Sequence, residues 1–324
     1  MTTAANLAGD FSASDGPGCP GGSIKLLNPQ TGQPLLNNHI DPSYFNATAL
    51  ALAKYFPAPT DACGLVTFAI PSQTRENQFV TRVDWAINHK HSAYGRYWVD
   101  GYQKPAFYAP TNFLITGSTG AYQRVQSLAL NETYIVSQHL VNSFTATGTI
   151  RVILRGPAGT GINASTLGIH IYSPAAVGVP ISASGKWSIY GGAPANFAQN
   201  TFSFADNVTW MLGKHQIGFG GEYNRSQFNE NNVYKGNGSF GFSGIFAHTG
   251  PHGTSAGGTG NDANLDFLTG SLNSFAQTSN QLDALRAPIP TLYVMDTYRL
   301  NKKVVLTGGV RWSPEFFPTD VFGR

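Results

Sequence analysis

The sequence predicts an all-β protein, and more narrowly part of an antiparallel transmembrane β-barrel, for three reasons. Only 11% of the 324 residues are charged, whereas an ordinary soluble protein carries about 25%. The chain holds 37 glycines and 19 prolines, which interrupt helices, and it lacks the run of roughly 18 apolar residues that a membrane helix requires. Four pairs of alternating segments are each joined by a turn of three residues. This pattern predicts about eight strands in four hairpins.

The hairpins follow one another along the chain, each with an apolar face and a polar face. In the third hairpin Phe204 and Trp210 share one face, and Ser203 and Thr209 share the other. Acidic residues interrupt two otherwise apolar faces, which is tolerable near a strand end and costly near the middle of a bilayer; they are Glu132 and Asp206. The predicted strands span residues 78–88 and 92–100, 125–136 and 140–152, 201–212 and 216–225, and 292–300 and 304–314.

Three long connections, rich in Gly, Asn, Ser and Thr, separate the hairpins. They span roughly residues 101–121, 154–199 and 226–287. Because every short turn alternates with a long connection, all the long connections leave the sheet at the same end. Short turns at one end and long polar loops at the other are typical of outer-membrane barrels. We therefore expect short periplasmic turns, long extracellular loops and a location in the cell outer membrane of a Gram-negative type of bacterium.

The chain is expected to divide into two regions. Residues 1–77 form an extracellular loop segment with a short helix, and residues 78–324 form the partial outer-membrane β-barrel. Asp41 and Pro42 are suited to begin the helix, and Pro57 is suited to end it. Since the first strand runs from this segment toward a short turn, the segment is predicted at the extracellular end of the sheet.

The two cysteines, Cys19 and Cys63, both lie in the N-terminal segment. A disulfide between them would stabilise the segment by about 4 kcal/mol in the chain-entropy model, provided that the compartment is oxidising. The alternative is that they are two unrelated thiols. The first residues have neither the basic nor the apolar region of a secretory signal, so either the protein stays inside the cell or the chain is incomplete.

A series of short motifs runs along nearly the whole chain. The motifs are residues 8–12 (AGDFS), 27–34 (LNPQTGQP), 40–42 (IDP), 51–59 (ALAKYFPAP), 77–84 (NQFVTRVD), 199–202 (QNTF), 206–210 (DNVTW), 213–222 (GKHQIGFGGE), 264–268 (NLDFL), 293–300 and 306–312. In this order they resemble the barrel of the Oar-like TonB-dependent outer-membrane receptors. Any single motif is a weak signal, whereas the ordered series is specific.

The resemblance implies a function and a set of partners. In such receptors the extracellular loops capture a ligand, and an inner-membrane complex pulls on a plug to open a barrel of about 22 strands. The implied partners are outer-membrane lipid, the TonB energy-coupling complex and an unknown ligand, with an oligosaccharide or a peptide possible. The family's signal peptide, regulatory-like domain, plug and first strands would precede residues 8–12, and more strands would follow. The resemblance therefore implies an internal fragment of a longer receptor.

Two other functions fit parts of the sequence. A passive porin or surface-adhesion β-barrel without energy coupling needs no plug, and Arg82, Arg96, Glu222 and Arg311 would then set the electric field of its pore. The same charges would also suit a barrel wall that they merely cross-link. The third hypothesis is a soluble, secreted all-β binding module. The low charge and the outward aromatic residues fit this hypothesis poorly.

Ligand recognition is expected in the long loops, because loops on a rigid scaffold commonly carry function. Five aromatic residues are candidates for stacking on a sugar or peptide. They are Tyr172, Trp187, Tyr190, Phe240 and Phe242. The alternative is that these rings pack the loops against one another.

No enzymatic function is predicted. The sequence has no nucleophile elbow, zinc-protease motif, P-loop or dinucleotide-binding fingerprint, so we expect no catalytic residue, no cofactor and no metal ligand. His248 and His252 lie among Gly and Pro residues that prevent a helix from presenting both on one face, and Asp262 and Asp266 lack the spacing of a calcium loop. The net charge of +3 argues against nucleic-acid binding.

Overall fold

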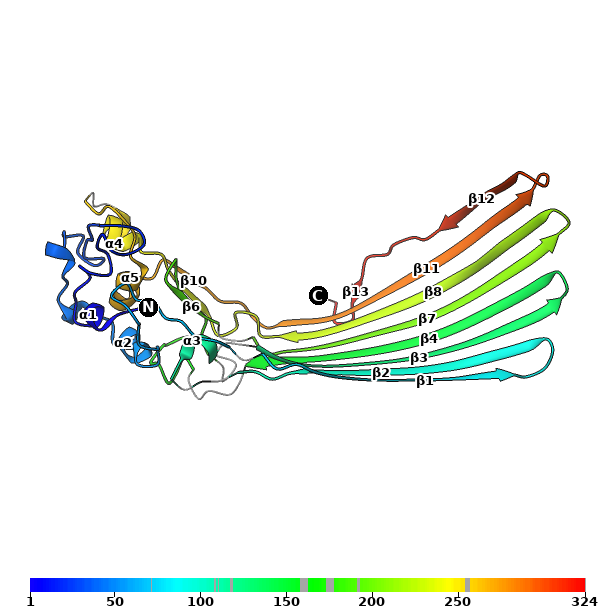
Figure 1. Cartoon of the computed structure of the whole chain (residues 1–324), viewed down its shortest axis with the longest axis horizontal. Helices are drawn as coiled ribbons and strands as arrows, with labels where there is room; N and C mark the ends of the chain where they lie inside the picture. Colours follow the sequence, from blue (N-terminus) through cyan, green and yellow to red (C-terminus); the bar gives the residue numbers. More distant parts are fainter. Residues whose placement is uncertain are drawn as a thin grey trace.

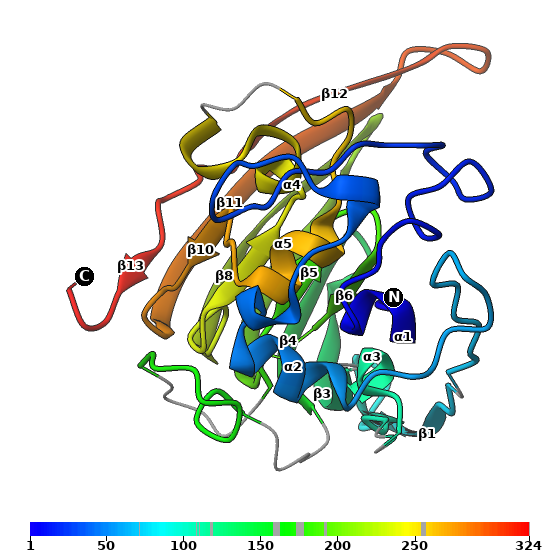
Figure 2. The same cartoon turned by 90° about the vertical axis from the view of Figure 1, so that its left-hand side faces the viewer.

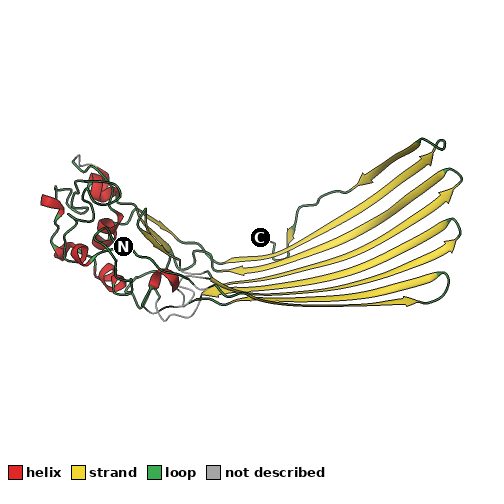
Figure 3. Cartoon of the chain, in the orientation of Figure 1, coloured by secondary structure: helices red, strands yellow, loops and turns green. Residues whose placement is uncertain are grey.

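The computed structural model describes residues 1–70, 72–107, 109, 111–116, 119–157, 163–172, 178–190, 193–253 and 257–323. A large curved sheet of long strands forms one part of the molecule (Figure 1). At one end of the sheet lies a smaller part, which contains the helices (Figure 3). We call this part the loop domain; it consists of residues 1–70 and the described residues within 105–118, 158–194 and 233–280. Among the described residues, no helix has the length and apolar character needed to cross a membrane.

The large sheet contains the four predicted hairpins, which confirms the all-β, antiparallel fold class. Its strands are β1 (Arg75–Ala86), β2 (His91–Lys104), β3 (Thr119–Ser137), β4 (Leu140–Pro157), β7 (Ala195–Leu212), β8 (His215–Asn232), β11 (Gln281–Arg299) and β12 (Val305–Trp312). They are hydrogen-bonded in that order, every neighbour antiparallel, and the short β13 (Thr319–Asp320) also pairs with β11. The short turns lie at one end of the sheet and the long connections at the other (Figure 1).

Most strands are longer than the sequence pattern predicts. β11 begins at Gln281, eleven residues before the predicted start at Leu292, and it pairs with β8 over this whole extension. An 18-residue strand is about 60 Å long, about twice the thickness of the hydrocarbon core. Outside the bilayer both faces of a strand meet water, so strict apolar and polar alternation is no longer required. The alternating pattern therefore ends before the hydrogen-bonded ladder does.

The strand registers sort the side chains into two faces, because cross-strand partners share a face. One row of partners runs Val83, Gly95, Leu130, Ala146, Phe204 and Tyr223. The neighbouring row, on the opposite face, runs Arg82, Arg96, Ala129, Thr147, Ser203 and Asn224. Large apolar residues on the first face are exposed, with Val83 at 68%. An exposed apolar face of this extent is suited to lipid, and the polar face is suited to a barrel interior.

Acidic residues on the apolar face are each paired across a seam, as we call the junction between two successive hairpins. At the seam of β2 and β3, His91 Nδ1 lies 2.7 Å from Glu132 Oε1. At the seam of β8 and β11, His215 Nδ1 lies 2.6 Å from Asp296 Oδ2. Asn142 donates to Asp206 across the seam of β4 and β7. All three pairs lie toward the short-turn end, where a polar contact costs less than at the bilayer centre.

The N-terminal segment begins its main helix later than predicted. Asp41 caps only the short 3-10 turn η2 (Pro42–Tyr44), after which Phe45 is extended. Asn46 then accepts hydrogen bonds from the backbone N–H groups of Thr48 and Ala49 and starts α2 (Ala47–Ala53). A second N-capping residue therefore divides the predicted helix in two. Two further short elements precede these, α1 (Ala4–Leu7) and η1 (Leu36–Asn38).

The long connections fold with the N-terminal segment around a shared hydrophobic core. They contain α3 (Phe113–Thr116), β5 (Ile181–Ala183), β6 (Trp187–Ile189), β9 (Ser239–Phe242), α4 (Ile245–Thr249), η3 (Pro251–Gly253), α5 (Ala263–Thr269) and β10 (Ser274–Ala276). The four short strands form a second sheet in the order β10-β9-β5-β6. Figure 2 shows the N-terminal segment crossing in front of α5 and this sheet. The core draws residues from both sides of the boundary predicted at residue 77, and the two-region division stays a prediction.

Candidate ligand-binding loop domain

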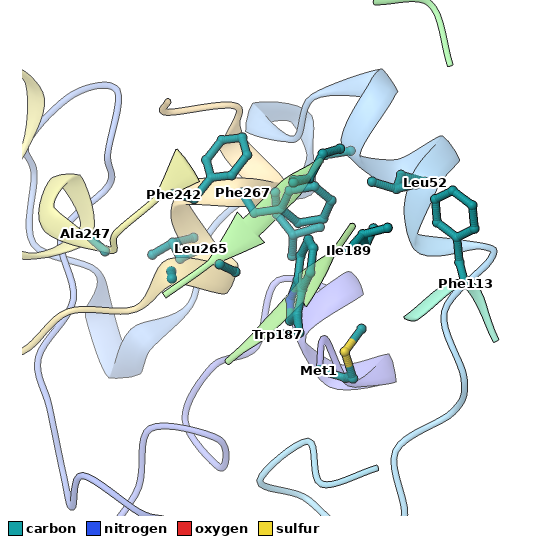
Figure 4. Close-up of a cluster of buried hydrophobic side chains, with 14 of the residues drawn as sticks. Met1, Leu52, Phe113, Trp187, Ile189, Phe242, Ala247, Leu265 and Phe267 are labelled. Atoms are coloured by element: carbon teal, nitrogen blue, oxygen red, sulfur yellow. The ribbon is translucent and has the colours of Figure 1, made fainter. Parts of the chain in front are cut away.

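A cluster of aromatic rings forms the centre of the loop domain. The ring of Trp187 lies 4.7 Å from that of Phe56 and 4.9 Å from that of Phe267, centroid to centroid. Phe267 also meets Phe242 edge-on at 5.5 Å. The indole N–H of Trp187 donates to Asn264 Oδ1 at 2.8 Å, which satisfies its buried polar atom. These rings join β6, β9, α5 and the end of the N-terminal segment into one core (Figure 4).

The structure places the five candidate aromatic residues in different surroundings. Trp187 and Phe242 are only 8% and 9% exposed and belong to the core, where their rings pack the loops together and also border the two cavities described below. Phe240 is half-buried against Phe275. Tyr172 and Tyr190 are 76% and 69% exposed. Ligand stacking stays a prediction for all five residues, and the two tyrosines are the ones with rings open to solvent.

Two cavities lie beside the aromatic cluster. One, of about 210 Å³, is lined mainly by apolar residues including Leu52, Phe240 and Phe267. The other, of about 450 Å³, is lined by Trp187, Tyr190 and aliphatic residues of the N-terminal segment and α3. Phe267 lines the first cavity and Trp187 lines the second. Because the two rings are in contact, the two cavities are neighbours. Both have the mostly apolar lining that is common in small-molecule sites.

Backbone hydrogen bonds attach the N-terminal segment to the connection between β8 and β11. Leu27 N–H donates to the carbonyl of Ala247 at 2.8 Å, and Asn46 N–H donates to that of Leu268 at 2.7 Å. The side chain of Gln30 adds a bond to the carbonyl of Thr269 at 2.9 Å. These contacts hold the aromatic cluster and the two cavities in one folded unit.

A disulfide joins Cys19 to Cys63, which are 44 positions apart in the sequence and have Cα atoms 5.4 Å apart. The bond ties the turn-rich stretch after α1 to the stretch that leads toward β1. From the sequence alone, a disulfide and two unrelated thiols were both possible. The bond now limits how far the two ends of the N-terminal segment can separate.

Three charged side chains from distant parts of the chain meet inside the loop domain. Lys186 Nζ lies 3.0 Å from Asp262 Oδ2 and 3.7 Å from Asp15 Oδ1. Burial, together with the charge of Asp262, raises the pKa of Asp15 to about 7. Burial opposes the charge on Lys186, but the two carboxylates outweigh it and raise the pKa of the amine. Sequence reasoning missed this cluster because its members share no local motif.

Asp266 is a fourth buried charge, one helical turn from Asp262. Burial raises the pKa of Asp266 to about 7, although backbone N–H groups of Phe246 and Ala247 donate to its carboxylate and oppose the shift. Asp262 itself caps α5 by accepting from Leu265 N–H. The two residues thus stabilise helix ends in the protein interior. Helix capping therefore accounts for these two aspartates, whose spacing in the sequence does not match that of a calcium-binding loop.

Other candidate groups from the sequence do not assemble into a chemical site in the part of the chain that the structure describes. There, no group of three or more His, Cys, Asp or Glu residues is placed to hold a metal ion. His248 contacts the side chain of Asn261, and the side chain of His252 lies outside the described residues. On the inner face, Arg82 binds Asp84 through two nitrogens and lies over the ring of Tyr94.

The long antiparallel sheet, with its apolar face and its short-turn end, defines a transmembrane β-barrel protein of the cell outer membrane. The chain belongs to the family described as the outer membrane beta barrel domain, whose model matches residues 1–324. No curated protein matches the sequence.

Several solved structures are similar to this chain. The outer membrane transporter YddB from Escherichia coli is 13% identical, with a TM-score of 0.47 over 77% of this chain and 28% of that one. The copper transporter OprC is 11% identical, with a TM-score of 0.43 over 74% and 28%. The siderophore receptor PiuA from Acinetobacter baumannii is 10% identical, with a TM-score of 0.40 over 75% and 35%. The chain thus spans 28 to 35% of the length of these proteins.

Proposed function

We propose that this chain is the ligand-capturing part of an Oar-like TonB-dependent outer-membrane receptor, which imports its ligand when complete. The observation that carries the proposal is the loop domain. Its hydrophobic core, disulfide and two cavities are far more than is needed to connect strands. A folded unit of this kind at the extracellular end of a barrel is suited to hold a ligand.

The form of the sheet supports a wide barrel. Within the described residues β1 pairs only with β2, and along its length β12 pairs only with β11. Free edges of this length are a hazard for aggregation unless further strands cover them. A receptor with more strands would cover both edges and enclose a lumen lined by the polar face.

The exposed aromatic residues support a sugar-like or peptide ligand. Tyr190 borders the larger cavity, beside Ser188 and near Lys186. Flat rings next to hydroxyl and ammonium groups are suited to stack on and hydrogen-bond to an oligosaccharide or a peptide. In the proposed receptor, the TonB energy-coupling complex would supply the force for import, and no enzymatic step is needed.

A passive porin or adhesion barrel is the second candidate. It is favoured by the charges on the inner face, where Arg82, Arg96, Glu222 and Arg311 lie on the side opposite the apolar row. Two of these side chains already have protein partners, since Arg82 binds Asp84 and Glu222 accepts from Ser203. Paired charges of this kind suit a cross-linked wall better than a field that selects ions.

An experiment on the native protein in outer membranes can distinguish the two candidate functions. We expect an antibody against residues 154–199 to detect a heat-modifiable band far above 34.6 kDa, bound to TonB after cross-linking. In planar bilayers the extracted protein should show no steady conductance, because a plug closes the lumen. A band near 34.6 kDa with stepwise conductance would instead establish a porin.

A further inference from the structure

The charged cluster of Asp15, Lys186 and Asp262 joins three segments of the loop domain. Asp15 belongs to the N-terminal segment, Lys186 to the turn between β5 and β6, and Asp262 to the first residue before α5. The side chains of Asp15 and Asp262 are only 4% and 1% exposed. Because each residue comes from a different segment, the cluster acts as a contact between the segments and not within one of them.

The charges in this contact do not balance when both carboxyl groups are ionised. One ammonium group faces two carboxylates, which are close enough to share a hydrogen bond when one holds a proton. Among the described residues, Asp15 Oδ2 has no hydrogen-bond partner, whereas Asp262 Oδ2 is paired with Lys186 Nζ at 3.0 Å. An unpaired buried carboxylate is costly, whereas a protonated one is neutral and donates a hydrogen bond.

Two more titratable groups face the cluster. In this chain the amino group of Met1 donates to the carbonyl of Gly64 and lies near Lys186 and Asp262; in the longer receptor proposed above, this nitrogen belongs to a peptide bond and has no charge. Asp266 faces Asp262 from the next turn of α5. When it is ionised, Asp266 adds negative charge on the side of Asp262. Asp15 therefore has Lys186 as its compensating charge and Asp262 as its competitor.

We propose that Asp15, Lys186 and Asp262 form a proton-operated latch that closes the loop domain when the two carboxyl groups hold one proton between them. When this proton is released to solvent, two negative charges face one ammonium group. The stretch around Asp15 then separates from the β5–β6 turn and α5. Separation opens the loop domain beside Trp187 and the larger cavity, which Lys186 also borders.

The direction of the pH response follows from which state of the loop domain, closed or open, binds the proton more tightly. Burial and the neighbouring Asp262 hold the pKa of Asp15 at about 7 in the closed state, whereas an exposed aspartate titrates at about 4. The closed state therefore binds the proton more tightly than the open state does. The free energy by which this proton stabilises the closed state relative to the open state is fully present at low pH. It declines between about pH 4 and pH 7 and is lost above this range. Acid closes the latch and neutral to mildly basic pH opens it.

The latch deepens the proposed function, since it would regulate access to the cavity that is expected to hold the ligand. Its test needs neither a ligand nor import. The full-length protein in detergent is examined by hydrogen–deuterium exchange at pH 5 and pH 8, with intrinsic exchange rates corrected for pH. We expect protection of residues 11–27 and 181–189 to fall at least tenfold at pH 8. Protection in β7 and β8 should stay constant.

Two variants make the experiment specific to the latch. Asp15→Asn keeps the shape of the side chain and removes its titration, so protection at pH 8 should equal that at pH 5. Asp41→Asn is the matched control, because Asp41 is an exposed capping residue and asparagine caps equally well; it should keep the wild-type response. Asp266 titrates in the same range, but its partners are in α4, so its response is expected in residues 245–250.

The latch would be overturned by equal wild-type protection of residues 11–27 at the two pH values. It would also be overturned if Asp15→Asn folded and kept the full pH response. The wild-type comparison is decisive even if the variant does not fold. A pH response in a protein that proves to be a porin would leave the latch standing and contradict only the proposed function.

Discussion

Gly220 shows how one residue without a side chain permits a contact across three strands. Asn207, Gly220 and Tyr293 are neighbours on the inner face, on β7, β8 and β11. The hydroxyl of Tyr293 reaches over Gly220 and donates to Asn207 Oδ1 at 2.7 Å. A Cβ atom on Gly220 would lie 2.9 Å from the Tyr293 ring and would also meet the carbonyl oxygen of Asp206. The glycine is therefore required by close packing.

Replacing this glycine should destabilise the sheet. We expect Gly220→Ala to lower the free energy of unfolding by about 1 to 3 kcal/mol, because the backbone and the Tyr293 ring must both move. The measurement is urea unfolding in micelles. Gly156→Ala in β4 is the control, since a Cβ there meets nothing within 4 Å. Equal stability of the two variants would contradict this role.

At the scale of the strand, alternation decides which side chains meet lipid. In β7, Phe204 pairs with Tyr223 and Ala146 on the apolar face, whereas Ser203 pairs with Asn224 and Thr147 on the polar face. A shift of one residue in register would exchange the two sets. The side chains on each face therefore report directly on how the hairpin sits in the bilayer.

A carboxylate introduced on the apolar face should destabilise the barrel more than one introduced on the polar face. We expect Phe204→Asp to destabilise the assembled barrel by about 2 kcal/mol or more relative to Ser203→Asp, because only the first carboxylate must enter hydrocarbon. Trp210→Asp and Thr209→Asp form a second matched pair nearer the turn, where the difference should be smaller. Refolding into lipid vesicles, followed by gel shift, measures the effect. Equal losses for Phe204→Asp and Ser203→Asp would refute the assigned facing.

At the scale of the whole molecule, three long connections and the N-terminal segment become one folded unit. Ordering connections of this length costs a large amount of conformational entropy, which the shared core and the Cys19–Cys63 bond offset. The sheet is stabilised separately by its own ladders. The two parts should therefore respond differently to loss of the disulfide.

Removing both cysteines, as Cys19→Ser with Cys63→Ser, should destabilise the loop domain by up to about 4 kcal/mol. The gel shift that reports the folded barrel should stay unchanged. Urea unfolding followed by proteolysis of residues 1–70 measures the first effect, and reduction of the wild-type protein should reproduce it. Loss of the barrel shift in the double variant would show that the two parts fold together.

The sequence predicted the hairpins well because alternation is a local signal. It failed where the signal is absent or distant. The first eleven residues of β11 show no regular alternation of apolar and polar side chains, and two of them are prolines. The sequence also left open whether the rings of Trp187 and Phe242 face a ligand or a core, since an aromatic residue in a polar loop looks the same in both cases; the structure buries both rings.

By itself the sequence determined the antiparallel sheet, its four short turns and its lipid-facing side, because each depends on neighbours a few residues apart and on the period of two. Only the tertiary structure decided that the long connections share a core and that Asp15, Lys186 and Asp262 meet. Those contacts join residues up to 247 positions apart, and their free energy depends on burial, which no local pattern records.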